Sequence, residues 1–300
     1  MTSAASGAHP RAYLIAGANG MLGTALRRVL AARGSRFLAP AEAAFDITDE
    51  EAVALAVADF VEVLLPGESG VLVNAAAYTN VERAEDDAKT AYRVNEHGAR
   101  VLAEAAQRTG LGFVHVSTDF VFDGTKNGPY VETDSTNPIS VYGASKLAGE
   151  VAVLGADPEA LVVRTAWVFG PAGVNFPVKI LEAARKNPQL KVVTDEIGSP
   201  TYTLDLAAGI LGLVDVGADG IFHLVGAGSC SRFELATEIL ALAGIPTPVL
   251  PVTADAFPTK AARPMNSVLN CGKAASLGVT MPEWRDAVAR FLREAGELPS

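Results

Sequence analysis

Apolar segments only four or five residues long recur along the first half of the chain. They span 12–16, 36–39, 71–74, 113–117 and 161–165, and each is almost continuously apolar. Strands of this kind are typical of a parallel sheet that is covered on both faces. The longer segments between them carry apolar residues at helical spacing. The pattern therefore predicts a doubly wound α/β fold, the Rossmann arrangement of a parallel sheet between layers of helices.

Three helices are predicted between these strands. The first spans 21–32, where apolar side chains recur on one stripe. Thr48 and Glu51 have the spacing of a capping box ahead of a second helix at 52–60. The third is a single long helix at 84–108.

Beyond residue 170 the alternation loosens, because prolines divide the chain into short elements. Ser231 and Glu234 have capping-box spacing, and an apolar strand at 220–225 suggests a return to the first sheet. Helices are predicted at 176–184, 205–213, 231–243 and 282–295. We therefore divide the chain into a flexible tail at 1–10, a Rossmann domain at 11–170 and a smaller C-terminal lobe at 171–300.

The composition is that of a globular protein, with 49% hydrophobic and 19% charged residues and no apolar run long enough to span a bilayer. The net charge of −10 disfavours attachment to nucleic acid or to anionic lipid. Residues 1–10 have no basic start and no apolar core, so we expect no targeting segment. Cys230 and Cys271 form no close-spaced pair, which indicates reduced thiols in a cytoplasmic protein.

A glycine-rich turn follows the first strand. Gly17, Gly20 and Gly23 have G-x-x-G-x-x-G spacing and lead into the first helix. Such glycines allow a tight turn and let the backbone approach a pyrophosphate at the helix N-terminus. The motif alone could be an ordinary glycine-rich turn, but its place between the first strand and the first helix favours a dinucleotide.

The second strand runs into Ala39 and Pro40 without a carboxylate, the group that usually holds the ribose hydroxyls of NAD. The nearest acid is Glu42. We therefore expect NADPH as the cofactor, with NADH also accepted. Asp46 has two open interpretations, since it either faces the adenine or belongs to a helix entry near Thr48.

A tyrosine and a lysine are placed for proton transfer. Tyr142 and Lys146 are four residues apart and share one helix face, while Thr118 stands at the end of an earlier strand. A nearby ammonium favours the phenolate of a tyrosine, whose pKa is otherwise near 10. The Thr118 hydroxyl can bond the same carbonyl oxygen. A Y-x-x-x-K pair is common on surface helices, but together with the glycine turn it predicts an active site.

Other kinds of site lack their residues. The four histidines show no zinc spacing, and the chain has neither a G-x-S-x-G elbow nor a Walker lysine. His115 lies within a predicted strand, so we expect a packed core histidine.

With these residues in place, the chain resembles the dTDP-4-dehydrorhamnose reductases, a family of extended short-chain dehydrogenases. The resemblance covers almost the whole chain, and its C-terminal motifs are the more discriminating. The motifs are NAAAYT at 74–79, VERAE at 81–85, STDFVFDG at 117–124, VYGASKLAGE at 141–150, RTAWVFG at 164–170, GSPTYT at 198–203 and RPMNS at 263–267.

The resemblance implies reduction of the 4-keto group of dTDP-4-dehydro-β-L-rhamnose by NAD(P)H. Tyr142 would donate the proton, and Lys146 would bind the nicotinamide ribose. Thr118 and Asp119 would contact the sugar, with Trp167 packed near it. The residues implied to line the cofactor are Gly20, Met21, Leu22, Asp46, Ile47, Ala76, Ala77 and Tyr78.

The pyrophosphate of the sugar nucleotide needs local donors in a chain of charge −10. We expect the helix that begins at Asn175 to offer free N–H groups, and Arg263 to clamp phosphate oxygens. Some relatives are metal-bridged dimers. No cluster in this sequence has convincing ligand spacing, so we predict no metal and leave a homodimer open.

Two positions depart from the family pattern. Phe120 replaces a usual Tyr, and Glu196 replaces a usual Gln and adds a negative charge near the substrate. Dehydratases of the same fold carry a Glu at the position of Phe120, and this Glu deprotonates the sugar. A phenylalanine cannot abstract a proton, so dehydration is not expected. The remaining alternatives are a 4-ketoreductase for another dTDP-4-keto-6-deoxy sugar and a non-catalytic nucleotide-binding regulatory subunit.

Overall fold

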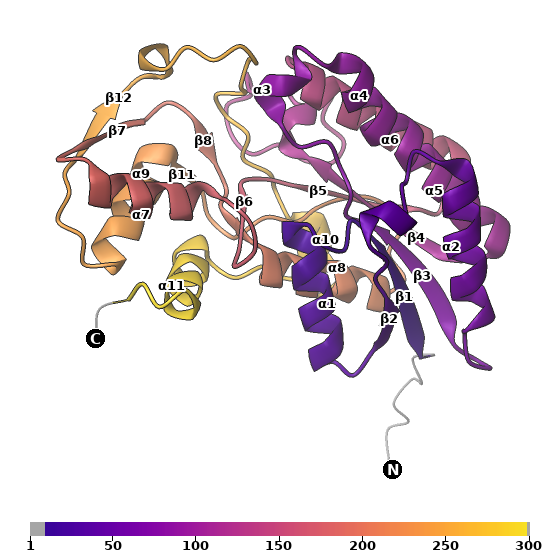
Figure 1. The fold of residues 1–300 in the computed structure, drawn as a ribbon. Coiled ribbons are helices and arrows are strands. Elements are labelled where there is room, and N and C mark those ends of the chain that lie inside the picture. The colour runs from indigo at the N-terminus through magenta and orange to yellow at the C-terminus, as the bar shows by residue number, and fades with distance from the viewer. Residues whose placement is uncertain (1–9, 299–300) are drawn as a thin grey trace.

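A six-stranded parallel sheet forms the centre of the computed structural model, which describes residues 10–298 (Figure 1). The strand order is β10-β5-β4-β3-β1-β2, and every neighbouring pair is parallel. The predicted doubly wound α/β fold is confirmed. Nine of the ten residues in the predicted tail lie outside the described residues. The strands are β1 (Arg11–Ala16), β2 (Arg36–Leu38), β3 (Ser69–Asn74), β4 (Gly112–Thr118), β5 (Leu161–Thr165) and β10 (Gly220–His223).

Helices cover both faces of this sheet (Figure 1). On one face α1 (Met21–Ala32) packs beside α8 (Thr203–Asp215) over a continuous apolar core. On the other face lie α2 (Glu50–Glu62), α5 (Ala99–Thr109) and α6 (Val141–Ala156). Both faces of the strands are therefore buried, which is why the strand segments are almost continuously apolar.

The expected capping box before α2 is wrong. Asp49 is the N-cap residue, because its carboxylate accepts hydrogen bonds from the backbone N–H groups of Glu51 and Ala52. Thr48 instead donates its hydroxyl to Asp46 at 2.8 Å. An aspartate directly before the helix competes successfully for the orphan donors of the first turn.

The single helix expected at 84–108 is divided. The pieces are α3 (Val81–Ala84), α4 (Ala88–Tyr92), a π-helical turn at Arg93–Gly98 and α5. Asp87 starts α4 by accepting a hydrogen bond from Thr90 N. The π turn places Asn95 so that its side chain binds both backbone groups of Tyr78, at 2.8 and 3.1 Å, and Ser145 Oγ, at 2.9 Å. These bonds tie the loop after β3 to α6.

The second part of the molecule is built from short elements around its own apolar core (Figure 1). The predicted capping box of Ser231 and Glu234 is confirmed at the start of α9.

The remaining elements of the whole described chain are η1 (Glu42–Ala44), η3 (Asp119–Val121), β6 (Val168–Phe169), α7 (Phe176–Lys186), β7 (Leu190–Val193), β8 (Ile197–Gly198), β9 (Thr201–Tyr202), β11 (Cys230–Ser231), α9 (Arg232–Leu242), β12 (Val249–Val252), η4 (Ala254–Ala256), α10 (Gly272–Ser276) and α11 (Trp284–Glu294).

Residues beyond 170 contribute to both parts of the molecule. The strand expected at 220–225 is β10, which pairs with β5 at the edge of the central sheet. Helix α8 packs on α1, and α10 contacts β10. The chain therefore passes through the smaller part and returns to the sheet.

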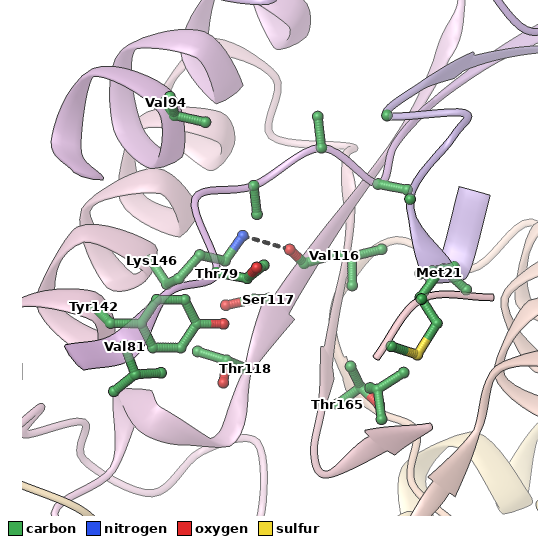
Figure 2. A pocket seen from close by; sticks show the side chains of 18 of the residues that line it. Met21, Thr79, Val81, Val94, Val116, Ser117, Thr118, Tyr142, Lys146 and Thr165 are labelled. Carbon is green, nitrogen blue, oxygen red and sulfur yellow. Dashed lines mark hydrogen bonds between the residues drawn. The ribbon is translucent and has the colours of Figure 1, made fainter. Parts of the chain in front are cut away.

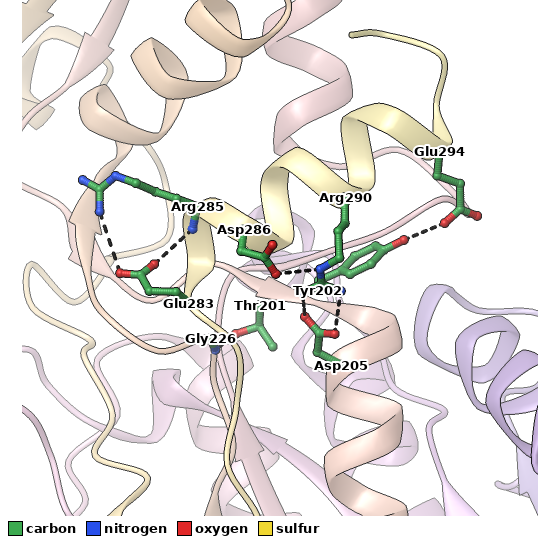
Figure 3. A network of polar contacts seen from close by, with 9 residues as sticks. All are labelled: Thr201, Tyr202, Asp205, Gly226, Glu283, Arg285, Asp286, Arg290 and Glu294. Carbon is green, nitrogen blue, oxygen red and sulfur yellow. Dashed lines mark hydrogen bonds and ion pairs between the residues drawn. The ribbon is translucent and has the colours of Figure 1, made fainter.

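A polar network fastens the last helix to this framework (Figure 3). Arg290 on α11 donates two hydrogen bonds to Asp205 at the start of α8, at 2.8 and 2.7 Å. The Tyr202 hydroxyl on β9 donates to Glu294 at 2.7 Å.

Across residues 10–298, no helix combines the length and the apolar character that a membrane span needs.

A buried ion pair joins α6 to the sheet. Arg164 on β5 donates two hydrogen bonds to Glu150 on α6, at 2.9 and 2.6 Å, and both side chains are almost fully buried. Ser117 on β4 donates to the same carboxylate. The pair therefore fixes the helix against two neighbouring strands.

We expect Glu150→Gln to lower the free energy of unfolding by about 3–5 kcal/mol, because it leaves the Arg164 charge buried without a partner. Urea unfolding of the ligand-free protein measures this. The matched control is Asp215→Asn, which breaks solvent-accessible pairs with Arg33 and Arg11 and should cost less than about 1 kcal/mol. Equal losses in the two variants would contradict the role assigned to the buried pair.

Candidate active site

A cavity of about 730 Å³ opens at the carboxyl ends of the central strands. Most of its lining residues lie in the turns and helices that follow the central strands, and Arg232 and Arg263 reach it from the second part of the chain. The chain leaves β1 for β2 on one side and places β3 on the other, so the strand order reverses between β1 and β3. Ligands of open α/β sheets bind at such a reversal.

The glycine turn lies at this reversal. Gly17 has φ of 73°, and a Cβ there would lie 2.5 Å from Ala76 N. A Cβ on Gly23 would lie 2.2 Å from Gly17 O, so the third glycine lets α1 approach the turn. Gly20 is the N-cap of α1 and has no side chain to bond the N–H groups of the first turn. Those donors and the close backbone fit a pyrophosphate.

The end of the cavity beyond this turn is lined by Glu42, Phe45, Asp46, Ile47 and Thr48. Asp46 accepts hydrogen bonds from the backbone N–H and the hydroxyl of Thr48, at 2.9 and 2.8 Å, and these bonds lower its pKa. Asp46 thus belongs to the local turn with Thr48 and also lines the cavity. The two interpretations left open by the sequence are compatible.

The structure brings most of the predicted cofactor residues together. Met21, Leu22, Ala76 and Ala77 line the cavity with Gly17 and Gly20. Three predicted site residues are not among its lining residues. Gly23 lies behind the turn, the backbone of Tyr78 is bound by Asn95, and Asn175 caps α7 by accepting from Val178 N while donating to Gly170 O at 2.7 Å.

Thr118, Tyr142 and Lys146 meet on one side of the cavity (Figure 2). Ser140 starts α6 as its N-cap, so Tyr142 lies in the first turn and Lys146 one turn later. A Cβ on Gly143 would lie 2.2 Å from Phe120 O, so this glycine lets α6 approach the end of β4 closely. The Phe120 ring packs edge-on against the Tyr142 ring at 5.5 Å.

The expected lowering of the Tyr142 pKa by Lys146 is not found. Burial raises the pKa of Tyr142 to about 12, with a smaller opposing effect of the Thr118 hydroxyl. The Lys146 Nζ atom instead donates to Val116 O at 2.6 Å (Figure 2) and lies 3.4 Å from His115 Nε2. Burial lowers the pKa of Lys146 to about 8. The phenol is therefore protonated at neutral pH and can act as an acid.

His115 is the packed core histidine that the sequence predicted. It is fully buried, and its Nδ1 atom lies 3.1 Å from the Asn74 side-chain nitrogen. Burial holds its pKa well below the usual value, with a smaller effect of the Lys146 charge. A neutral imidazole next to Lys146 leaves the ammonium as the cation of this region.

The substrate end of the cavity holds a buried acid. Asp119 is 2% exposed, and its Oδ1 atom accepts a hydrogen bond from Thr118 at 3.0 Å. Its Oδ2 atom has no hydrogen-bond partner within residues 10–298. Burial raises the pKa of Asp119 to about 6, although nearby hydroxyls and the charge of Arg232 lower it in part.

Arg232 is a site residue that sequence reasoning missed. Its guanidinium carbon lies 3.4 Å from the centre of the Trp167 ring, and its Nε atom is 3.5 Å from Glu196. The free negative charge expected at Glu196 is therefore paired. Arg232 follows a helix cap and belongs to no spacing motif, so no signal in the sequence marks it.

Arg263, expected to clamp phosphate oxygens, lines the cavity and is paired with a carboxylate. Its Nη2 atom donates to Glu82 at 2.9 Å, and Glu82 also accepts from Lys260 N at 2.9 Å. The late loop is thus tied to α3. No group of three or more His, Cys, Asp or Glu side chains is placed to hold a metal ion in the described part of the chain.

Fold and site together define a nucleotide-binding oxidoreductase of the short-chain dehydrogenase class. The chain matches the model described as the RmlD substrate binding domain over residues 11–296. It is 41% identical to a dTDP-4-dehydrorhamnose reductase of Mycolicibacterium smegmatis over 96% of this chain and 88% of the relative. The chain belongs to the family of dTDP-4-dehydrorhamnose reductases.

Two further comparisons bear on fold and substrate. The crystal structure of dTDP-4-dehydrorhamnose reductase from Bacillus anthracis in complex with NADP superimposes with a TM-score of 0.89 at 35% identity, covering 95% of this chain and 99% of the other. A Streptomyces antibioticus protein, named a probable dTDP-4,6-dihydroxy-2-methyloxan-3-one 4-ketoreductase, is 39% identical over 94% of each chain. Proteins that are similar to this chain are therefore named for reactions on different keto sugars.

The raised pKa of Asp119 makes the stability of the protein depend on pH. Between pH 3.8 and about 6 the folded state binds more protons at Asp119 than the unfolded state, so this residue destabilises the fold as pH rises through that window. We expect Asp119→Asn to gain roughly 3 kcal/mol relative to the parent between pH 3 and pH 7. Urea unfolding at several pH values measures the difference, and a pH-independent difference would refute the assignment.

Proposed function

We propose that this chain reduces the 4-keto group of dTDP-4-dehydro-β-L-rhamnose with NADPH and so forms dTDP-L-rhamnose. One observation carries the proposal: Thr118, Tyr142 and Lys146 line the same cavity as the glycine turn at the strand reversal. Membership of the reductase family supports the choice of a dTDP-4-keto sugar as the substrate.

The chain offers suitable groups for NADPH. The turn at Gly17 and Gly20 would hold the pyrophosphate, and the small residues Ala76 and Ala77 leave room beside it. Asp46 and Ile47 would lie along the adenosine end. Lys146 would bind the nicotinamide ribose. When bound, NADPH supplies the hydride that C4 of the sugar accepts.

Tyr142 is the proposed proton donor. As C4 is reduced, its oxygen gains negative charge, and the Tyr142 hydroxyl gives it a proton. The raised pKa keeps the phenol protonated before the reaction. Thr118 would hydrogen-bond the same oxygen and orient it. The Lys146 ammonium on the same helix face would stabilise the phenolate left behind.

On the substrate side, Asp119 and Trp167 would contact the sugar. Arg263 would bind the pyrophosphate by exchanging Glu82 for phosphate oxygens, which a planar guanidinium can bind in pairs. Asn175 would contribute backbone N–H groups at the start of the helix that it caps. Its side-chain amide is not free for the substrate, because both ends of the amide are already hydrogen-bonded. The free thiols of Cys230 and Cys271 fit a protein that is located in the cytoplasm.

A second candidate is reduction of another dTDP-4-keto-6-deoxy sugar. The similarity to the Streptomyces antibioticus protein favours it, and so does Glu196 at a position where the family usually has Gln. Dehydration is disfavoured because Phe120 stands beside Tyr142 and offers no base. The intact group of Thr118, Tyr142 and Lys146 favours an enzyme over a non-catalytic regulatory subunit.

The test is NADPH oxidation by the purified protein with a panel of dTDP-4-keto sugars and no partner protein. We expect kcat/KM to be greatest for dTDP-4-dehydro-β-L-rhamnose and at least as high with NADPH as with NADH, because β2 ends without a carboxylate. A strong preference for NADH would contradict the cofactor argument and identify Glu42 as the ribose ligand. No oxidation with any sugar of the panel would overturn the proposed reaction.

We expect Tyr142→Phe to lower kcat by roughly 10²–10⁴-fold, the usual contribution of a general acid. The NADPH affinity should stay nearly unchanged, because a single oxygen is lost. Steady-state kinetics and fluorescence titration measure the two quantities. Tyr92→Phe, in α4 outside the cavity, is the matched control. If the Tyr142 variant kept turnover within a few-fold of the control, Tyr142 would not be the donor.

A further inference from the structure

Arg232 is a cation held in a fixed plane on the cavity wall. It is the first residue of α9, and its side chain is only 18% exposed. The guanidinium lies 3.4 Å from the Trp167 ring centre and 5.3 Å from that of Phe176. Stacking on aromatic rings fixes the plane of the group and leaves its N–H edge free to donate.

The wall behind Arg232 is rigid. Trp167 has φ of 47°, the only positive value at a non-glycine residue in the described part of the chain. A Cβ on Gly198 would lie 2.3 Å from the Trp167 ring, so the indole packs directly against the backbone of β8. A strained residue that its surroundings hold in place is common at binding sites.

The donors of Arg232 are not used up within the protein. Glu196 is the one carboxylate within the described residues that is in ion-pair contact with Arg232, at 3.5 Å from Nε. A guanidinium has five N–H donors, so this single partner leaves others for a ligand. Burial lowers the pKa of Arg232 to about 10, so the group remains charged at neutral pH. The cavity wall therefore carries a charged donor whose N–H groups are only partly used by Glu196.

Asp119 supplies the complementary group. Its Oδ2 atom is buried without a hydrogen bond of standard geometry, although the Ser267 hydroxyl lies near enough to lower the Asp119 pKa. The side chains of Asp119 and Arg232 line the same cavity. The two charges interact, since the charge of Asp119 raises the pKa of Arg232. A hydroxyl group can donate to the carboxylate and accept from the guanidinium, which satisfies both.

The local charge argues against a phosphate at this place. With Asp119 and Glu196 ionised, the charge of Arg232 already interacts with two carboxylates, which disfavours another anion beside it. Arg263, on the late loop, is the better group for the pyrophosphate. We propose that Arg232 is a specificity-determining residue that donates to a hydroxyl group of the sugar ring, with Asp119 accepting from that hydroxyl. This proposal rests on the proposed function, since it requires a sugar nucleotide in the cavity.

The experiment compares kcat/KM for the keto sugar nucleotide with kcat/KM for analogues that each lack one ring hydroxyl. A hydrogen bond to a charged group is worth about 1.5–3 kcal/mol, so the parent should discriminate roughly 10- to 100-fold against one deoxy analogue. Arg232→Met keeps most of the aliphatic part of the side chain and removes the guanidinium. In this variant we expect the discrimination against that one deoxy analogue to disappear. Discrimination against analogues that lack a different ring hydroxyl should remain. Arg232→Lys should give an intermediate value.

The matched control is Arg285→Met. Arg285 also stacks on a tryptophan, Trp284 at 4.3 Å, and pairs with a glutamate, but it belongs to α11 outside the cavity (Figure 3). This variant should discriminate as the parent does. Inhibition by dTDP, which has no sugar, separates hydroxyl binding from phosphate binding. Its inhibition constant should be nearly unchanged in Arg232→Met and clearly raised in Arg263→Met.

Two results would overturn the proposal. One is an Arg232→Met variant that retains the discrimination of the parent. The other is a variant that loses activity equally with every analogue while its affinity for dTDP falls, which would assign Arg232 to the phosphates. Failure of the proposed function looks different, because the parent itself would then neither turn over nor bind any dTDP sugar.

Discussion

The buried pair of Arg164 and Glu150 holds α6 against the central sheet, and the candidate site depends on where that helix lies. The pair fixes the middle of α6 to β5, and Ser117 adds a bond from β4. At the start of the same helix, Gly143 allows close contact with the backbone of Phe120. Held at both places, α6 presents Tyr142 and Lys146 at a fixed distance from the strand ends.

Burial then determines the chemistry of the residues on this helix. It raises the pKa of Tyr142 to about 12 and lowers that of Lys146 to about 8, so at neutral pH the phenol stays protonated and most of the lysine stays charged. A protonated phenol suits a reduction in which the substrate oxygen must gain a proton. The lysine donates to Val116 O and lies beside His115 Nε2, so its ammonium is held at the end of β4.

The cavity joins two sets of residues that are far apart in the sequence. The glycine turn and the residues of α6 lie in the first half of the chain, beside the central sheet, whereas Arg232 and Arg263 come from the second part of the chain. Each arginine is paired with a carboxylate, Glu196 or Glu82. A chain of net charge −10 thus keeps its cations near the cavity in specific pairs, from which a ligand can take over hydrogen bonds.

The sequence by itself determined the layered fold, the glycine turn and the face shared by Tyr142 and Lys146, because strand length, helical spacing and glycine placement are local properties. It also placed the capping box at Ser231. The sequence did not determine the contacts of Asn95 with Tyr78 and Ser145 or the pairing of Glu196 with Arg232, because residues distant in sequence form both. The pKa of Tyr142 belongs to the same group: burial sets it, and burial exists only once α6 has packed against β4.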